Sequence, residues 1–171
     1  MYNNVMDKFK WGNMETTDPI YLDENILRMT TNLRLQLSSL AEALIDEGKE
    51  KEAGEILDLS LEKMPERNVP FDRILLPTVE AYYELGQNEK ANVLAERLFT
   101  IMEENLNFYL SLDPKHAAAL SDEMAISHAV MGRLSSTANK ADATMGAGMQ
   151  ERFKEMEQQY QGKLMELDGG K

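Results

Sequence analysis

The two histidines, His116 and His128, are the side chains best suited to proton transfer or metal binding in this chain of 171 residues, which has no cysteine. Two ligands that hold one metal ion from a single helix lie four positions apart, because that spacing puts both on one face. The histidines lie too far apart in sequence for that pattern. We therefore interpret each as a helix-surface or interface histidine, and we expect neither a metal site nor a cofactor.

Nucleophiles and carboxylates are also present, but they lack the partners that catalysis needs. The serine pairs at 38–39 and 135–136 have no glycine elbow and no base nearby in the sequence. The acidic pairs at 46–47, 103–104 and 122–123 are typical of solvated helix faces. Because no acid, base and nucleophile converge, and no glycine-rich loop could cradle a phosphate, we expect that the chain is not an enzyme.

The formal net charge of −12 bears on the kind of partner. A polyanion repels phosphate backbones, so the charge disfavours nucleic acid and anionic membrane surfaces. A basic peptide, a sugar or another protein surface stays compatible with it. No apolar run approaches the roughly 20 residues that a bilayer-spanning helix needs.

Helical periodicity begins at about residue 23, after a mixed segment that predicts irregular structure over residues 1–20. The expected helices cover residues 23–47, 51–64, 71–85, 89–112 and 115–137. Asp23 is suited to cap the first, and Gly48, Pro65, Gly86 and Pro114 stand at the breaks. Pro77 lies inside the third segment, where it either kinks the helix or marks its first turn.

An internal repeat is the strongest pattern in the sequence. Gly48 and Ala53 are followed 38 residues later by Gly86 and Ala91. A tetratricopeptide unit places large, small and aromatic residues on its first helix, glycine at the turn, and alanine on its second helix. In the first repeat these positions are occupied by Leu37, Leu40, Ala41, Leu44, Gly48, Ala53, Leu57 and Pro65. In the second repeat they are occupied by Leu75, Thr78, Val79, Tyr82, Gly86, Ala91 and Ala95.

The predicted fold is therefore all-α: a tetratricopeptide-like right-handed stack of helical hairpins with a C-terminal capping helix. We expect three parts: an irregular segment covering the first repeat at 1–22, the repeats at 23–138, and an amphipathic helix or flexible tail at 139–171. The last part carries a nearly heptad stripe of Met149, Phe153, Met156, Tyr160, Leu164 and Leu167. Such a helix either folds back on the preceding hairpin or docks on a partner.

The concave surface of a tetratricopeptide stack is the candidate binding site. This surface is lined by residues on the first helix of each repeat. In this sequence those residues are mostly acidic and include one aromatic side chain: Glu42, Asp46, Arg73, Glu80, Tyr83 and Glu84, with Ser38 beside them. We hypothesise that this groove receives a basic or polar segment of a protein or peptide partner. The alternative is that these are ordinary exposed residues.

A second candidate is the small basic and aromatic cluster of Lys8, Lys10 and Trp11 in an otherwise acidic chain. Lysine and tryptophan are both suited to the interface between a membrane and water. The cluster could therefore anchor the repeats against a membrane body or lipid head groups. Alternatively Trp11 plugs the outer face of the first repeat, which needs a cover.

Six short stretches together resemble the C-terminal region of bacterial multi-pass membrane proteins related to protein O-mannosyltransferases. They are residues 6–14 (MDKFKWGNM), 21–25 (YLDEN), 28–29 (RM), 40–44 (LAEAL), 70–71 (PF) and 110–114 (LSLDP). The resemblance covers about residues 1–135, and its most specific part is the stretch from Lys8 to Gly12.

The resemblance implies a membrane-embedded glycosyltransferase-like body followed by a helical-repeat domain on the periplasmic or extracytoplasmic face of the inner membrane. The catalytic acidic residues of such enzymes lie in the membrane body, so no catalytic residue is carried over to this chain. The partner could then be the membrane body of its own parent chain. A free-standing tetratricopeptide adaptor, which would be cytoplasmic, is the alternative, and an independent enzyme is a distant third.

Overall fold

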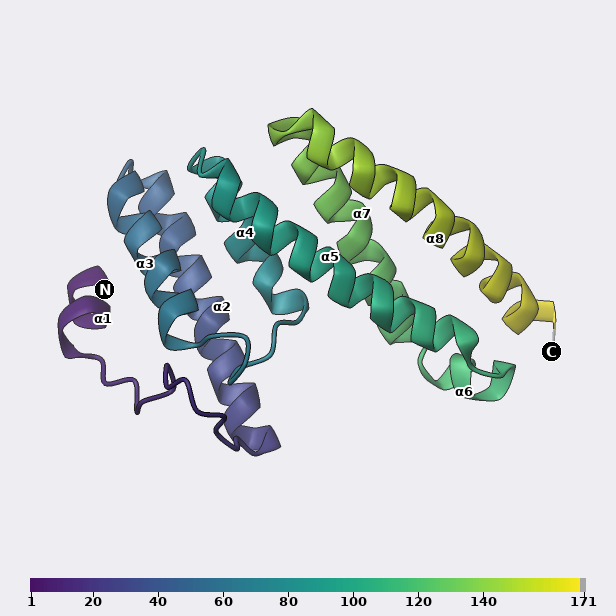
Figure 1. Ribbon diagram of the computed structural model, residues 1–171, viewed down its shortest axis with the longest axis horizontal. Helices are drawn as coiled ribbons and strands as arrows, with labels where there is room; N and C mark the ends of the chain where they lie inside the picture. The colour runs from purple at the N-terminus through teal and green to yellow at the C-terminus, as the bar shows by residue number, and fades with distance from the viewer. Residues whose placement is uncertain (170–171) are drawn as a thin grey trace. The chain divides into compact units, whose positions relative to one another are not determined.

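The structure is a computed structural model that describes residues 1–169, and within these residues it contains helices and no β-strand (Figure 1). This confirms the all-α prediction. The chain divides into two compact units, Met1–Gln87 and Asn88–Lys171. The division falls inside the segment 23–138, which the sequence predicts to be one array of repeats.

The first unit is built around a helical hairpin. Its elements are α1 (Tyr2–Lys8), α2 (Glu24–Asp46), α3 (Glu50–Lys63), the 3₁₀ turn η1 (Arg73–Leu75) and α4 (Leu76–Glu84). Figure 1 shows α2 and α3 lying side by side. The Asp23 carboxylate accepts a hydrogen bond from the Ile26 N–H at 2.9 Å, as expected of the residue that caps α2.

The two glycines of the repeat end their helices in the same way. Gly48 and Gly86 have φ angles of 72° and 67°, a region that side chains with a Cβ rarely occupy. The N–H of Gly48 donates to the Ile45 carbonyl, and the next N–H donates to the Leu44 carbonyl. Gly86 and its successor make the same pair of bonds to residues 83 and 82. Both ends are Schellman motifs, which agrees with the predicted helix breaks at these two glycines.

The third predicted helix is shorter than expected. Residues 73–75 form the 3₁₀ turn, and α4 begins only at Leu76, so Pro77 stands in the first turn of the helix. A proline at that position removes no intrahelical hydrogen bond and needs no kink. Of the two readings of Pro77, the first-turn reading is therefore correct.

Small residues allow α2 and α3 to approach each other closely. Ala41 and Ala53 are both fully buried, as are Ile56 and Leu57 beside them. Leu40, in contrast, is only half-buried, so it contributes less to the core than its place in the repeat pattern suggests. The burial of both alanines agrees with the role that the repeat assigns to them.

We expect Ala53→Leu to destabilise the first unit by about 1–3 kcal/mol, because the larger side chain has no space at this buried position. Urea denaturation followed by the fluorescence of the chain's single tryptophan, Trp11, measures the effect in this unit. Val93→Leu is the control, because Val93 is 71% exposed. An Ala53→Leu protein as stable as the parent would contradict the close approach of these helices.

The N-terminal segment contains a helix that the sequence analysis misses, because α1 occupies residues that were expected to be irregular. A helix of seven residues is marginal alone, so its contacts with α3 must stabilise it. Val5 is 1% exposed, and the Tyr2 hydroxyl donates a hydrogen bond to Glu55 of α3. This bond raises the Tyr2 pKa to about 12, because the nearby carboxylate opposes a second negative charge.

The second unit consists of α5 (Asn88–Ser111), α6 (Pro114–Ala119), α7 (Ser121–Ala141) and α8 (Ala143–Gly169). The predicted fifth helix at 115–137 is thus two helices, which separate at Leu120. A single residue, Asp142, joins α7 to α8. Its carboxylate accepts hydrogen bonds from the N–H groups of Thr144 and Met145 and from Asn92 of α5, and these bonds lower its pKa.

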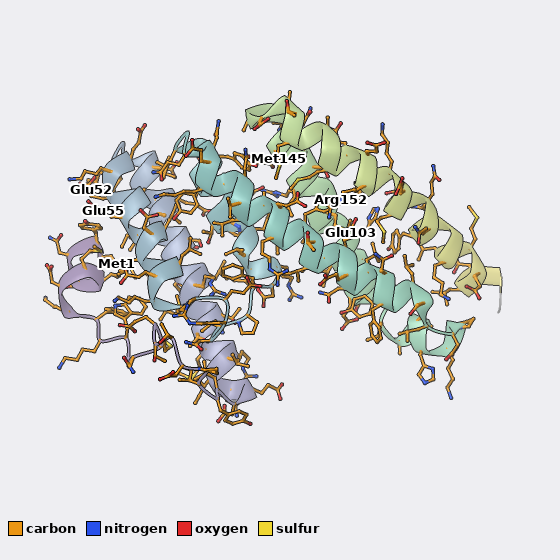
Figure 2. The ribbon with its side chains drawn as sticks, viewed as in Figure 1. Met1, Glu52, Glu55, Glu103, Met145 and Arg152 are labelled. Carbon is orange, nitrogen blue, oxygen red and sulfur yellow. The ribbon has the colours of Figure 1, made fainter. Side chains whose placement is uncertain are left out.

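The last helix folds back within its own unit. α8 packs against α7 and α5, and its stripe buries Met149, Met156 and Tyr160. The Arg152 guanidinium of α8 pairs with Glu96 and Glu103 of α5 and lies 2.6 Å from the Glu103 carboxylate. Arg152 and Glu103 are labelled in Figure 2. The fold-back interpretation of residues 139–171 is therefore correct for the described part. Its end, at residues 170 and 171, lies outside the described residues.

Candidate functional site

The helices expected to carry the groove are neighbours in the first unit. Ser38 of α2 and Thr78 of α4 are both fully buried, and their hydroxyl oxygens lie 2.7 Å apart. This bond joins the C-terminal half of α2 to the first turn of α4. Ser38 itself therefore belongs to the helix interface, which corrects its expected place on the groove surface.

The predicted groove residues differ in their exposure. Glu42 and Asp46 of α2, Glu84 of α4 and Arg73 of η1 are exposed, and Glu80 is half-buried. Tyr83 exposes only 9% of its surface, so its ring offers little area to a partner. The structure thus places exposed carboxylates on the paired helices, but it does not give them the aromatic platform expected from the sequence.

Arg73 lines a separate hollow of about 380 Å³ between η1 and the N-terminal half of α2. The other residues around it are Glu24, Leu27, Arg28, Thr31, Asn32, Asp72 and Ile74. None of the five remaining groove residues lines this hollow. The structure therefore groups Arg73 with the start of α2 and not with Glu42 and Asp46.

A larger hollow of about 560 Å³ lies at the other end of α2, and no sequence pattern indicated it. Its walls come from the start of α1, the end of α2 and the start of α3, and its lining is Met1, Tyr2, Asn3, Leu40, Ala43, Leu44, Glu47, Lys49 and Glu52. Glu52 and the first residue are labelled in Figure 2. The Lys49 ammonium, 2.5 Å from the Glu47 carboxylate, lowers the Glu47 pKa.

The basic and aromatic cluster is at the surface. Lys8 and Lys10 are exposed, and Trp11 is half-buried, with its ring centroid 5.8 Å from that of Phe9. Phe9 is itself 46% exposed. The plug and the anchor both stay predictions for Trp11, because its half-buried ring is compatible with either role.

Both histidines pair with carboxylates on helices. His116 lies 2.5 Å from the Asp113 carboxylate, which caps α6, and this contact lowers the Asp113 pKa. His128 of α7 pairs with Glu157 of α8, and its ring lies 4.5 Å from the Tyr160 ring. The first is thus a helix-surface histidine and the second an interface histidine, within the residues described.

Arg34 is a buried charged residue that the sequence analysis overlooked. It is fully buried, and its guanidinium donates to the carbonyls of Met64, Val69 and Pro70 at 2.7, 3.1 and 3.4 Å. Burial lowers its pKa to about 10. The signal was its spacing: Arg34 stands three residues before Leu37 and seven before Ala41, on the buried stripe of α2.

Metal binding and membrane spanning find no support in the described residues. Over residues 1–169, no group of three or more histidine, aspartate or glutamate side chains is arranged to hold a metal ion. Within the same range, no helix combines the length and the apolar character that a membrane span requires. The exposed carboxylates of Glu42, Asp46 and Glu84 on α2 and α4 stay a predicted binding surface.

Comparison with known proteins finds no significant match: no protein-family model, no curated protein and no solved structure is similar to this chain.

Proposed function

We propose that the chain is a non-catalytic domain that binds or positions a protein partner through the exposed acidic side chains of α2 and α4. In this proposal the hairpins form a tetratricopeptide-like stack, and the first helix of each repeat, α2 or α4, presents the binding surface. The supporting observation is that Glu42, Asp46 and Glu84 are exposed on two helices paired through Ser38 and Thr78. A rigid pair of helices holds such carboxylates at fixed spacing for a basic segment.

The twin Schellman motifs at Gly48 and Gly86 support the repeat part of the proposal. Equivalent helix ends 38 residues apart are what a duplicated helix–turn–helix unit requires. Ala53 and Ala91, each five residues after its glycine, are both fully buried, and this also supports a duplicated helix–turn–helix. These are local features of the two sequence repeats, and they support a common building plan for the repeats.

We further propose, from the sequence resemblance, that the chain is the extracytoplasmic part of a longer glycosyltransferase-like membrane protein. Sequencing the coding DNA upstream of Met1 tests this. An in-frame extension encoding several apolar segments of about 20 residues is the expected result. A stop codon and a ribosome-binding site directly upstream would withdraw this part and leave a free-standing adaptor.

A charge reversal tests the binding surface. We expect the double substitution Glu42→Lys and Glu84→Lys to weaken the binding of lysine- and arginine-rich peptides at least tenfold, since two attractive contacts become repulsive. Fluorescence anisotropy with a panel of labelled basic peptides and the full chain measures the dissociation constants. Both positions are exposed, so the fold should persist, as circular dichroism will verify.

The matched control is Glu104→Lys with Asp122→Lys in the second unit, where both side chains are also exposed. It changes the net charge equally but leaves α2 and α4 intact. If both double variants bind the peptides as the parent does, or lose affinity to the same extent, the surface has no specific role.

A further inference from the structure

The N-terminal segment presents a patch of apolar and basic side chains on an acidic protein. We define the N-terminal patch as Met6, Lys8, Phe9, Lys10 and Trp11. Met6 and Phe9 are 38% and 46% exposed, both lysines are exposed, and Trp11 is half-buried. Large apolar side chains gathered within six residues, rather than scattered singly, mark an interaction surface.

The patch is fastened to the first unit on both sides. Before it, Val5 is buried and the Tyr2 hydroxyl donates to Glu55 of α3. After it, the Asn68 amide donates to the carbonyls of Met14 and Thr16 at 2.7 and 3.0 Å. The Arg67 guanidinium donates to the neighbouring Glu15 carbonyl at 2.6 Å.

These bonds hold the chain at residues 2–5 and again at 14–16. Between these two points Lys8, Phe9 and Lys10 are exposed. Phe9 leaves the helix in an extended conformation, with φ −68° and ψ 140°. Its ring is 46% exposed, whereas Val5 of α1 is 1% exposed.

Local charge is more important at this site than the net charge of the chain. At physiological salt the Debye length is about 8 Å, so distant carboxylates are largely screened. Asp7 is the acidic residue within the patch sequence, and Glu15 pairs with Lys63 at 3.3 Å. The lysines that flank Phe9 thus give the patch a basic character that most of the first unit lacks.

We propose that the N-terminal patch contacts a lipid bilayer containing anionic head groups. Phe9, Met6 and Trp11 enter the interfacial region, and Lys8 and Lys10 pair with phosphates at its surface. Aromatic rings beside lysines match this layer, whose inner side is apolar and whose outer side is charged.

The chain contains one tryptophan, and it lies within the patch, so its fluorescence reports this contact directly. We expect a blue shift of the emission when the full chain is mixed with vesicles of phosphatidylcholine and phosphatidylglycerol in a 7:3 ratio. Brominated lipids should quench the emission. The double substitution Lys8→Glu and Lys10→Glu should reduce the partition coefficient about tenfold or more, and vesicles of phosphatidylcholine alone should bind more weakly.

Two further variants separate the patch from general effects. Phe9→Ser should weaken vesicle binding without unfolding the protein, because the ring is half exposed. The pair Lys115→Glu and Lys154→Glu alters exposed lysines of the second unit and changes the net charge equally. It should bind vesicles far better than the patch variant.

The proposal is overturned if vesicles leave the Trp11 emission unchanged, or if both lysine pairs reduce binding equally. It is also overturned if Phe9→Ser binds like the parent. None of these outcomes depends on the peptide-binding surface of α2 and α4, so the two proposals fail separately.

Discussion

Gly146→Ala is expected to destabilise the second unit by about 3 kcal/mol, although alanine is the better helix former. A Cβ at Gly146 would overlap the Cα and the backbone nitrogen of Asn139 on α7, and a backbone cannot rotate away as a long side chain can. The single-residue connection at Asp142 prevents α8 from shifting along α7. The helices must therefore separate, with loss of packing along the start of α8.

Gly148→Ala is the matched control, two residues further along the same helix. An added Cβ there meets nothing within 4 Å, so the change should stabilise the unit by about 0.5–1 kcal/mol through helix propensity. Urea denaturation by circular dichroism gives the difference, and hydrogen exchange of the α7 and α8 amides locates it. Equal stability of the two variants would show that α7 and α8 do not cross closely at Gly146.

Arg34→Met should destabilise the first unit by about 3 kcal/mol or more. Methionine fills much of the volume, but it leaves the carbonyls of the buried residues Met64 and Val69 without this donor, and each buried unpaired carbonyl costs about 1–3 kcal/mol. The part-buried bond to the Pro70 carbonyl also breaks. The contact of the guanidinium with the Phe71 ring, 5.0 Å from its centroid, is lost as well. Arg34→Lys should be intermediate, because an ammonium cannot reproduce the planar fork.

Trp11 fluorescence during urea denaturation measures this effect in the first unit. The control is Arg28→Met on the same helix, since Arg28 is exposed and should change stability by less than about 0.5 kcal/mol. If Arg34→Met matches that control, the guanidinium does not hold the 64–70 connection. A confirmed effect would link Arg34 to the N-terminal patch, because Arg67 and Asn68 of this connection hold residues 14–16.

Local signals in the sequence predicted most of the helices. Asp23, Gly48, Gly86 and Pro114 act within one turn of the chain through capping bonds or fixed backbone angles, so their effects can be read without knowing the fold. The break at Leu120 gave no such signal, since neither glycine nor proline marks it. The helix α1 was missed because its stability depends on α3, some fifty residues away.

For the candidate sites too, the sequence predicted local features but not contacts between distant residues. Glu42, Asp46 and Glu84 are exposed, because charged residues on an amphipathic helix face water, and their place in a binding groove stays a prediction. The sequence could not show that Ser38 pairs with Thr78, that Tyr83 is nearly buried, or that Arg73 faces a different hollow. Each of these facts depends on how two helices are rotated against each other. Helical periodicity alone does not specify that rotation, because many residues of similar type recur with the same period.

The sequence by itself determined that this protein is helical, where most helices end, that it is acidic, and that a glycine-and-alanine pattern recurs after 38 residues. Only the tertiary structure decided that Arg34 is buried, that Gly146 touches backbone, and that Phe9 and Met6 stay exposed beside two lysines. Helix formation depends on neighbours within four residues, whereas burial and exposure depend on residues that only folding brings together.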